Sequence, residues 1–379
     1  MKRVFATFLI AAATAFLPHM SMAEEIKVGF QISMTGPLAS VGGRPIRNGI
    51  ELALKKIAQD QTLGAGRSLV PIITDNASDK TQAITLTSRL CSGDNVAIMI
   101  GPFGSAASAA AAPVANALGC PAIMIAVSPE VTKAGSWIFK AYENPSAIMK
   151  GLADYIVTLK PKDVLVVYNN DNPAVIDYKN SLVEFLRAAG ISDLPEETIL
   201  SAQTDFAALA TKIVDRDPDV LFIGTPPEGS ANLIIQARQA GLSEKVKVVG
   251  SDYFTSPAFL KVGGGAVEGV VYPTHYSAAR SDAFNKAFVD SYLAEYGSLP
   301  DSYAAVAYNA TWAAALAIKN AGPSPTRDQI RQALLRIKNV ESIMGTEKMS
   351  IDGERSVRYD MLMATVSGGK QAIVSQTAN

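Results

Sequence analysis

Residues 96–126 read VAIMIGPFGSAASAAAAPVANALGCPAIMIA, and this stretch decides the fold. Val96–Ile100 is a continuous apolar run, which is typical of a strand buried on both faces of a parallel sheet. Ser105–Leu118 is alanine-rich and long enough for a helix of about four turns. Pro121–Ala126 is a second apolar run. The order strand, glycine-containing turn, helix, strand predicts one unit of an α/β fold.

The same alternation of strands and helices continues on both sides of this unit. Before it we expect a strand, a helix, a strand and a helix at Ile26–Phe30, Gly43–Ala58, Leu69–Thr74 and Asp79–Leu90. After the polar, proline-containing segment Ala141–Pro145 the pattern restarts, with strands at Val164–Tyr168, Glu197–Leu200, Val220–Ile223 and Val246–Gly250. The sequence therefore predicts two doubly wound lobes with parallel sheets.

The C-terminal region is helical, with Ser281–Tyr296, Ser302–Asn320 and Thr326–Ile337 predicted as helices before a strand at Tyr359–Val366. Three helices without strands between them are too few for a third α/β domain. We expect them to pack back onto the first sheet, so that the chain crosses between the lobes more than once.

The N-terminus has the pattern of a secretory signal peptide. Lys2 and Arg3 precede the apolar run Val4–Leu17, and small residues lead to Ala23. A membrane anchor is the alternative, but the run is short and is followed by Pro18. We expect cleavage after Ala23 and a periplasmic product. The net charge of −1 and the lack of a basic stripe argue against nucleic acid as a partner.

Few residues are available for catalysis. Once the signal peptide is removed, His275 is the only histidine, which excludes multi-histidine metal sites. The chain has no Gly-x-Ser-x-Gly elbow and no P-loop, and the glycines at 263–265 do not follow a strand and open a helix as a dinucleotide-binding turn must. We predict a protein that is not an enzyme and uses no metal or cofactor.

The two cysteines fall on connections that feed neighbouring predicted strands. Cys91 ends a helix before one strand, and Cys120 precedes the next. Both therefore lie at the N-terminal edge of the first sheet, where an exported protein can form a disulfide bond. Two unrelated buried thiols are the alternative.

Ligands of open α/β sheets bind beyond the carboxyl ends of the strands. In the first lobe these ends carry the loops Gln31–Gly43, Gly101–Ser105 and Ala126–Pro129. Ser105 is suited to be the N-cap of the alanine-rich helix, whose free N–H groups would then face the cleft as a carboxylate needs. Ser105 could equally be a cap without a ligand.

Seven stretches along the mature chain are informative when taken together: Ser33–Gly42, Gly49–Ala53, Asp75–Asp79, Gly101–Ser105, Ser128–Thr132, Gln236–Gly241 and Ala307–Ala310. With these stretches in this order, the chain resembles a known family, the periplasmic ligand-binding proteins of branched-chain amino acid ABC transporters. The resemblance covers essentially the whole mature chain. It implies the type I periplasmic binding fold, in which two lobes joined by three crossovers close on a small ligand.

The resemblance also implies a set of ligand-binding residues. In the first lobe Ser105 matches a carboxylate-binding serine, and Ala126, Val127 and Ser128 match the segment that completes its site. In the second lobe the matching positions are Asn172, Thr225 and Asp252, with Tyr308 in the segment that returns to the first lobe. Asp252 matches an acidic residue that holds an α-ammonium group, although it could be a turn or cap residue.

Three positions depart from the family pattern. Val127 stands where threonine is common, Val41 replaces a frequent aromatic residue, and Asn172-Pro173 replaces the usual Tyr-Gly. These changes leave the identity of the ligand open: it is either a branched-chain amino acid or an aromatic or keto acid.

The lobes are expected at 24–143 with 274–345, and at 144–273 with 346–379. The resemblance implies a monomeric solute-binding protein that delivers an amino acid or similar small carboxylate to the membrane permease of an ABC importer. A sensory protein of the same fold, feeding a membrane receptor, is the first alternative. A hydrolase is the second, and it would depend on His275.

Overall fold

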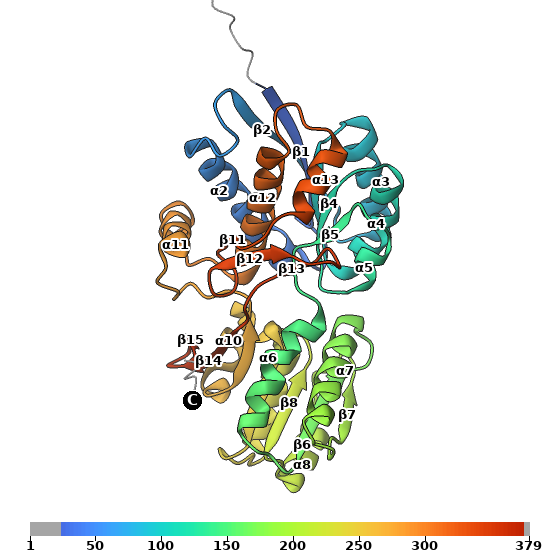
Figure 1. Cartoon of the computed structure of the whole chain (residues 1–379). Coiled ribbons are helices and arrows are strands. Elements are labelled where there is room, and N and C mark those ends of the chain that lie inside the picture. The colour runs from blue at the N-terminus through green and yellow to red at the C-terminus, as the bar shows by residue number, and fades with distance from the viewer. Residues whose placement is uncertain (1–23, 375–379) are drawn as a thin grey trace, which may run out of the picture.

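The computed structural model describes residues 24–374, and the predicted signal peptide at 1–23 lies outside them. The chain forms two α/β lobes, one above the other in Figure 1. The first lobe opens with β1 (Glu24–Ile32), α1 (Ala39–Gly42), α2 (Arg44–Gln59), β2 (Arg67–Asp75), α3 (Lys80–Ser88), η1 (Arg89–Gly93), β3 (Ile98–Phe103), α4 (Ser105–Ala117), β4 (Ala122–Ile125), α5 (Glu130–Lys133) and β5 (Ile138–Lys140).

The five strands of this lobe form one parallel sheet with the order β2-β1-β3-β4-β5. Helices cover both faces, so the five consecutive residues Val28–Ile32 of β1 are all buried. The strand order reverses between β1 and β3. Because ligands bind at such a switch point, the loops that follow β1 and β3 are in the right place for a site.

The second lobe contains α6 (Pro145–Thr158), β6 (Val164–Asn169), α7 (Pro173–Ala188), β7 (Glu196–Ile199), α8 (Ala207–Arg216), β8 (Val220–Gly224), α9 (Pro227–Gln239), β9 (Lys247–Gly250), η2 (Asp252–Thr255), α10 (Pro257–Gly263), η3 (Gly264–Val267) and β10 (Val271–Thr274). Its sheet has the order β15-β14-β10-β9-β8-β6-β7. The four neighbouring pairs β10-β9, β9-β8, β8-β6 and β6-β7 are all parallel. The order reverses between β6 and β8, which makes the ends of these two strands a second switch point.

The remaining elements are α11 (Ala283–Tyr296), α12 (Ser302–Asn320), α13 (Arg327–Leu335), β11 (Val340–Glu341), β12 (Lys348–Ile351), β13 (Val357–Arg358), β14 (Leu362–Ser367) and β15 (Lys370–Ile373). As predicted, the three helices pack onto the first lobe. Gly49 of α2 faces α12 so closely that a Cβ atom there would overlap the Ala304 carbonyl group. This approach requires glycine.

One predicted boundary is wrong. Residues 346–359 were expected in the second lobe, but Met349, Ile351, Val357 and Tyr359 are buried in the core of the first. They belong to the small antiparallel sheet β11-β12-β13. Strands of two to four residues carry too little periodicity to be recognised in the sequence. The chain returns to the second lobe only at β14, which pairs antiparallel with β10.

The chain therefore passes between the lobes three times, after β5, after β10 and after β13. The last strand, β15, forms a hairpin with β14 through Gly368 and Gly369, whose φ angles are 59° and 72°. Two positive φ angles are what a tight two-residue hairpin turn requires. β14 runs antiparallel to the predicted parallel strands, and β15, which is antiparallel to β14, extends the sheet beyond it.

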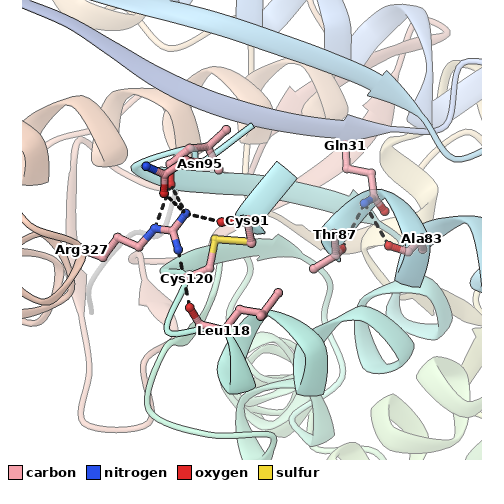
Figure 2. The surroundings of a disulfide bond; sticks show 9 residues. Gln31, Ala83, Thr87, Cys91, Asn95, Leu118, Cys120 and Arg327 are labelled. Atoms are coloured by element: carbon pink, nitrogen blue, oxygen red, sulfur yellow. Dashed lines mark hydrogen bonds between the residues drawn. A yellow bond between two sulfur atoms is a disulfide. The ribbon is translucent and has the colours of Figure 1, made fainter. Parts of the chain in front are cut away.

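Cys91 and Cys120 form a disulfide bond with their Cα atoms 5.8 Å apart, as the predicted positions suggested. Figure 2 shows Arg327 of α13 beside this bond. Its guanidinium group donates to the carbonyl oxygens of Cys91 (2.6 Å) and Val96 (2.7 Å). The disulfide and Arg327 together hold the N-terminal edge of the first sheet, opposite the edge that carries the candidate ligand loops.

Candidate functional site

The first candidate loop runs from β3 into α4. Gly104, at a φ angle of 90°, is the N-cap of α4, and Ser105 is its first helical residue. The prediction that Ser105 caps the helix is therefore wrong, because the chain turns through a conformation that glycine adopts most easily. Ser108 fixes the loop by donating from its hydroxyl to the Pro102 carbonyl oxygen (2.9 Å).

Ser105 instead contacts the second candidate loop. Its Oγ accepts a hydrogen bond from the Ser128 backbone N–H at 3.3 Å. This distance is long for an N–H···O bond, which is most often near 2.9–3.0 Å. Ala126 is buried beside the sheet, and Val127 packs against hydrophobic clusters of both lobes. The structure thus brings together four of the predicted residues, those of the first lobe.

The second lobe contributes a buried carboxyl group. Asp252 begins η2, directly after β9, and its Oδ1 atom is buried without a hydrogen-bond partner among the described residues. Burial raises the pKa of Asp252 to about 6, while the nearby Tyr178 hydroxyl favours the ionised form. A buried carboxylate with an unused oxygen is costly, and a ligand ammonium group would pair with it.

His275 lies next to Asp252, with its Nε2 atom 3.7 Å from Oδ2 of that residue. Neither ring nitrogen has a hydrogen-bond partner within residues 24–374. Burial lowers the pKa of His275 to about 3, so the imidazole is neutral near pH 7. The ring packs between Tyr142 (centroids 5.2 Å apart) and Tyr359 (6.1 Å). These three side chains come from the three crossings between the lobes.

Two other predicted residues take part in hydrogen bonds within the second lobe. Asn172 caps α7, its Oδ1 accepting from the Ala174 N–H at 3.1 Å, and its side chain lies beside the Tyr253 hydroxyl. Thr225 is buried at the end of β8, where its carbonyl oxygen accepts from the Ser230 hydroxyl (2.8 Å). Both lie at the second switch point, on the loops after β6 and β8.

Tyr308 does not lie with these residues, which corrects its assignment to the ligand site. Its ring packs between α11 and α12, 4.7 Å from the ring of Phe288. Tyr303 is the tyrosine of α12 that approaches the site. Its ring is 5.8 Å from that of Phe103, and burial and the charge of Asp252 raise its pKa. Residues five apart on a helix point in directions about 140° apart. Tyr303 and Tyr308 therefore lie on different faces of α12, and only Tyr303 lies on the face toward the site.

The lobes touch beside the site. The Thr255 hydroxyl of η2 lies 3.2 Å from the Ser302 hydroxyl at the start of α12, at hydrogen-bond distance. Within the second lobe, Tyr178 and Tyr253 pack edge to face, with centroids 6.1 Å apart. Sequence reasoning missed these tyrosines, and Tyr142 with them. Tyrosines occur in the sequence at 142 and within 272–276, close to two crossings between the lobes. Their position near the crossings is the signal that could have identified Tyr142.

The chemistry of the site is that of recognition. One side offers hydroxyl and N–H groups suited to an anion, and the other offers a carboxyl group suited to a cation. Among residues 24–374 no group of histidine, cysteine and acidic side chains is arranged to hold a metal ion. No helix in the same range is both long and apolar enough to cross a membrane. Two α/β lobes joined by three crossings, each with polar groups on the loops at the carboxyl ends of its strands, define a solute-binding protein.

The chain belongs to the periplasmic binding protein family, whose model matches residues 25–371. The Leu/Ile/Val-binding protein of Rhizobium johnstonii is 26% identical over 358 residues, covering 91% of this chain and 92% of the relative. A branched-chain amino acid transporter substrate-binding protein of Streptococcus pneumoniae, solved with isoleucine, is 26% identical, with a TM-score of 0.79 and coverage of 93% and 99%. A solute-binding protein of Rhodopseudomonas palustris, solved with 3,4-dihydroxybenzoic acid, is 26% identical, with a TM-score of 0.78 and coverage of 92% and 95%.

Proposed function

We propose that this chain is the solute-binding component of an ABC importer and that it binds an amino acid of the branched-chain type, or a similar small carboxylate, between its lobes. Two observations support this most, one from each lobe. Ser105 and Ser128 offer anion-binding groups in the first lobe, and Asp252 in the second offers a carboxyl oxygen that has no hydrogen-bond partner among residues 24–374.

The proposed mechanism is closure without chemistry. The ligand's carboxylate takes the place of the long Ser128–Ser105 hydrogen bond, and its ammonium group pairs with Asp252. Each lobe holds one end of the ligand, so the ligand binds the closed form better than the open one. Moving a protein from mostly open to mostly closed takes roughly 5.5 kcal/mol of differential affinity.

The proposed location is the periplasm, after cleavage of the signal peptide following Ala23. From there the loaded, monomeric protein delivers its ligand to a membrane permease. The same fold could instead report ligand binding to a membrane receptor, and permease genes beside this one would favour transport.

A second ligand class has an observation in its favour. Phe103, Tyr178, Tyr253 and Tyr303 bring four aromatic rings close to Asp252 or to the loop that follows β3. Aromatic surfaces of this kind also suit a ring-bearing acid. The relative solved with 3,4-dihydroxybenzoic acid belongs to the same group of structures.

We further propose that the protein is not an enzyme. The hydrolase alternative needs His275 as a base, hydrogen-bonded to a nucleophile. Both nitrogens of His275 lack a hydrogen-bond partner among the described residues, and its pKa of about 3 makes it a weak base. His275→Gln protein that retains any hydrolytic activity of the parent would remove this candidate.

Thermal melting in the presence of amino, keto and aromatic acids tests the proposed function. A ligand that binds the folded protein at a concentration of 100 Kd adds about 2.7 kcal/mol to its stability. Calorimetry then measures the Kd of each acid that raises the melting temperature. If no member of the three classes shifts the melt, the proposed function is wrong.

A further inference from the structure

Lys140 is a buried cation that the ligand site described above does not use. It ends β5 and is fully buried. Its Nζ atom donates to the Val127 carbonyl oxygen at 2.7 Å and to Asn144 Oδ1 at 2.5 Å. Asn144 in turn donates to Glu354 Oε2 at 2.5 Å. The lysine therefore joins a candidate ligand loop to the first crossing between the lobes and, through Asn144, to the turn between β12 and β13.

The carbonyl oxygen that Lys140 binds belongs to the peptide group between Val127 and Ser128. The Val127 carbonyl and the Ser128 N–H are the two ends of one planar amide, and in a trans peptide they point in opposite directions. The N–H end of this amide donates to Ser105 Oγ. A cation on the carbonyl oxygen thus fixes the direction of the N–H group, and it polarises the amide so that the N–H becomes a stronger donor.

We propose that Lys140 is a positioning residue of the ligand site, which holds and polarises the Val127–Ser128 peptide so that the Ser128 N–H is presented to the ligand's carboxylate. The proposal rests on the proposed function. It adds to it a buried positive charge behind the loop, which reaches the ligand through one peptide group.

The surroundings keep the lysine in place. Its backbone N–H donates to the Arg355 carbonyl oxygen at 2.9 Å. The Arg355 guanidinium group donates to the carbonyl oxygens of Ile138 (3.1 Å) and Thr132 (2.7 Å). The turn between β12 and β13 therefore clamps β5 from outside. An ordered ammonium group, and not a mobile one, faces the Val127 carbonyl.

The charges around Lys140 set the pH at which this effect is lost. Burial lowers the pKa of Lys140 to about 8, against the opposing charges of Asp352, Glu354, Asp177 and Glu143. These groups come from the β12–β13 turn, from α7 and from the first crossing, and Arg358 pairs with Glu143 at 3.6 Å. Above pH 8 the lysine becomes neutral and polarises the peptide less.

Binding by three variants tests the proposal. Lys140→Met removes the donor and the charge, and it should weaken binding of leucine, or of its keto acid if that is the ligand, by about three- to tenfold. Lys140→Gln keeps a donor but no charge, so it should also bind more weakly than the parent. Lys133→Met changes an exposed lysine on the neighbouring α5 and should bind like the parent. If Lys140→Gln matches the parent, the charge has no role and the proposal is wrong.

A readout that needs no ligand separates this proposal from the proposed function. In protein labelled with ¹⁵N-serine, the Ser128 amide resonance should shift with pH, with a midpoint near the Lys140 pKa of about 8. In Lys140→Met the shift should disappear, while Lys133→Met should retain it. A Ser128 resonance that does not respond between pH 6 and 10 overturns the proposal. If the parent protein binds none of the acids but shows this titration, the proposed function alone is wrong.

Discussion

The two faces of the ligand site differ in how well their polar groups are paired before a ligand arrives. In the first lobe Ser105 and Ser128 already bond to each other. Among the described residues, Asp252 of the second lobe has one oxygen without a hydrogen-bond partner, and His275, at the second crossing between the lobes, has two nitrogens without one. A ligand must exchange one hydrogen bond for another on the first face, but it supplies a missing partner on the second. Selectivity for a ligand amine should therefore come mainly from the second lobe.

The largest expected effect comes from removing the charge of Asp252. Asp252→Asn should weaken leucine binding by about 30- to several-thousand-fold, because truncating a buried charge pair costs about 2–5 kcal/mol. The keto acid, which has no ammonium group, should bind almost as it does to the parent. Asp290→Asn, an exposed aspartate of α11, is the control. If calorimetry finds that the variant loses equal affinity for leucine and for its keto acid, the two faces do not differ in the proposed way.

The next effect concerns stability alone. The disulfide closes a segment with a sequence separation of 29, and its loss should cost on the order of 3 kcal/mol. Reductant should lower the melting temperature of the parent and leave a Cys91→Ala/Cys120→Ala protein unchanged. Because the bond lies at the opposite edge of the sheet from Ser105, ligand affinity should stay within about twofold. A large loss of affinity would mean that the first face depends on this distant clamp.

Ser105→Ala should have a smaller effect on binding, and it should affect both acids. A hydrogen bond to a charged group contributes about 1.5–3 kcal/mol, so the Kd should rise roughly ten- to hundredfold. The fold should be unaffected, because Ser105 makes no side-chain capping bond in α4. Ser291→Ala on α11 is the matched control. Unchanged affinity in the Ser105 variant would remove the first face from the site.

The smallest effect is a pH dependence that only an amino acid should show. Burial raises the pKa of Asp252 to about 6. An ammonium group binds the ionised carboxylate, so leucine affinity should fall as the pH drops from 6 to 4, by at most about tenfold per unit. His275, with a pKa of about 3, stays neutral over this range. Keto acid binding should not fall, and Asp252→Asn should abolish the pH dependence for leucine.

The same two faces show what could be predicted from the sequence. The first face depends on local order, since a strand, a glycine turn and a helix place Ser105, and the next strand places Ser128. Both were expected, although Gly104 and not Ser105 caps the helix. The disulfide was also expected, because its cysteines precede adjacent parallel strands.

The second face and the hinge depend on long-range packing, which no local pattern reveals. His275, Tyr142 and Tyr359 meet only because three separate crossings come together. Tyr303 and Tyr308 lie on one helix, and only the packing of α12 against α2 and α11 decides which tyrosine faces the site. The small sheet β11-β12-β13 was missed because its strands are short. Lys140 was missed because its partners, Val127 and Asn144, come from the second candidate loop and from the first crossing.

The most direct test of the account is a crystal structure with leucine or, if calorimetry identifies another ligand, with that acid. The account predicts that the ligand's carboxylate oxygens lie within hydrogen-bond distance of Ser105 Oγ and the Ser128 N–H. It also predicts that an amine, where the ligand has one, lies against Asp252. A ligand held with its carboxylate in the second lobe, or bound outside the site between the lobes, would contradict it.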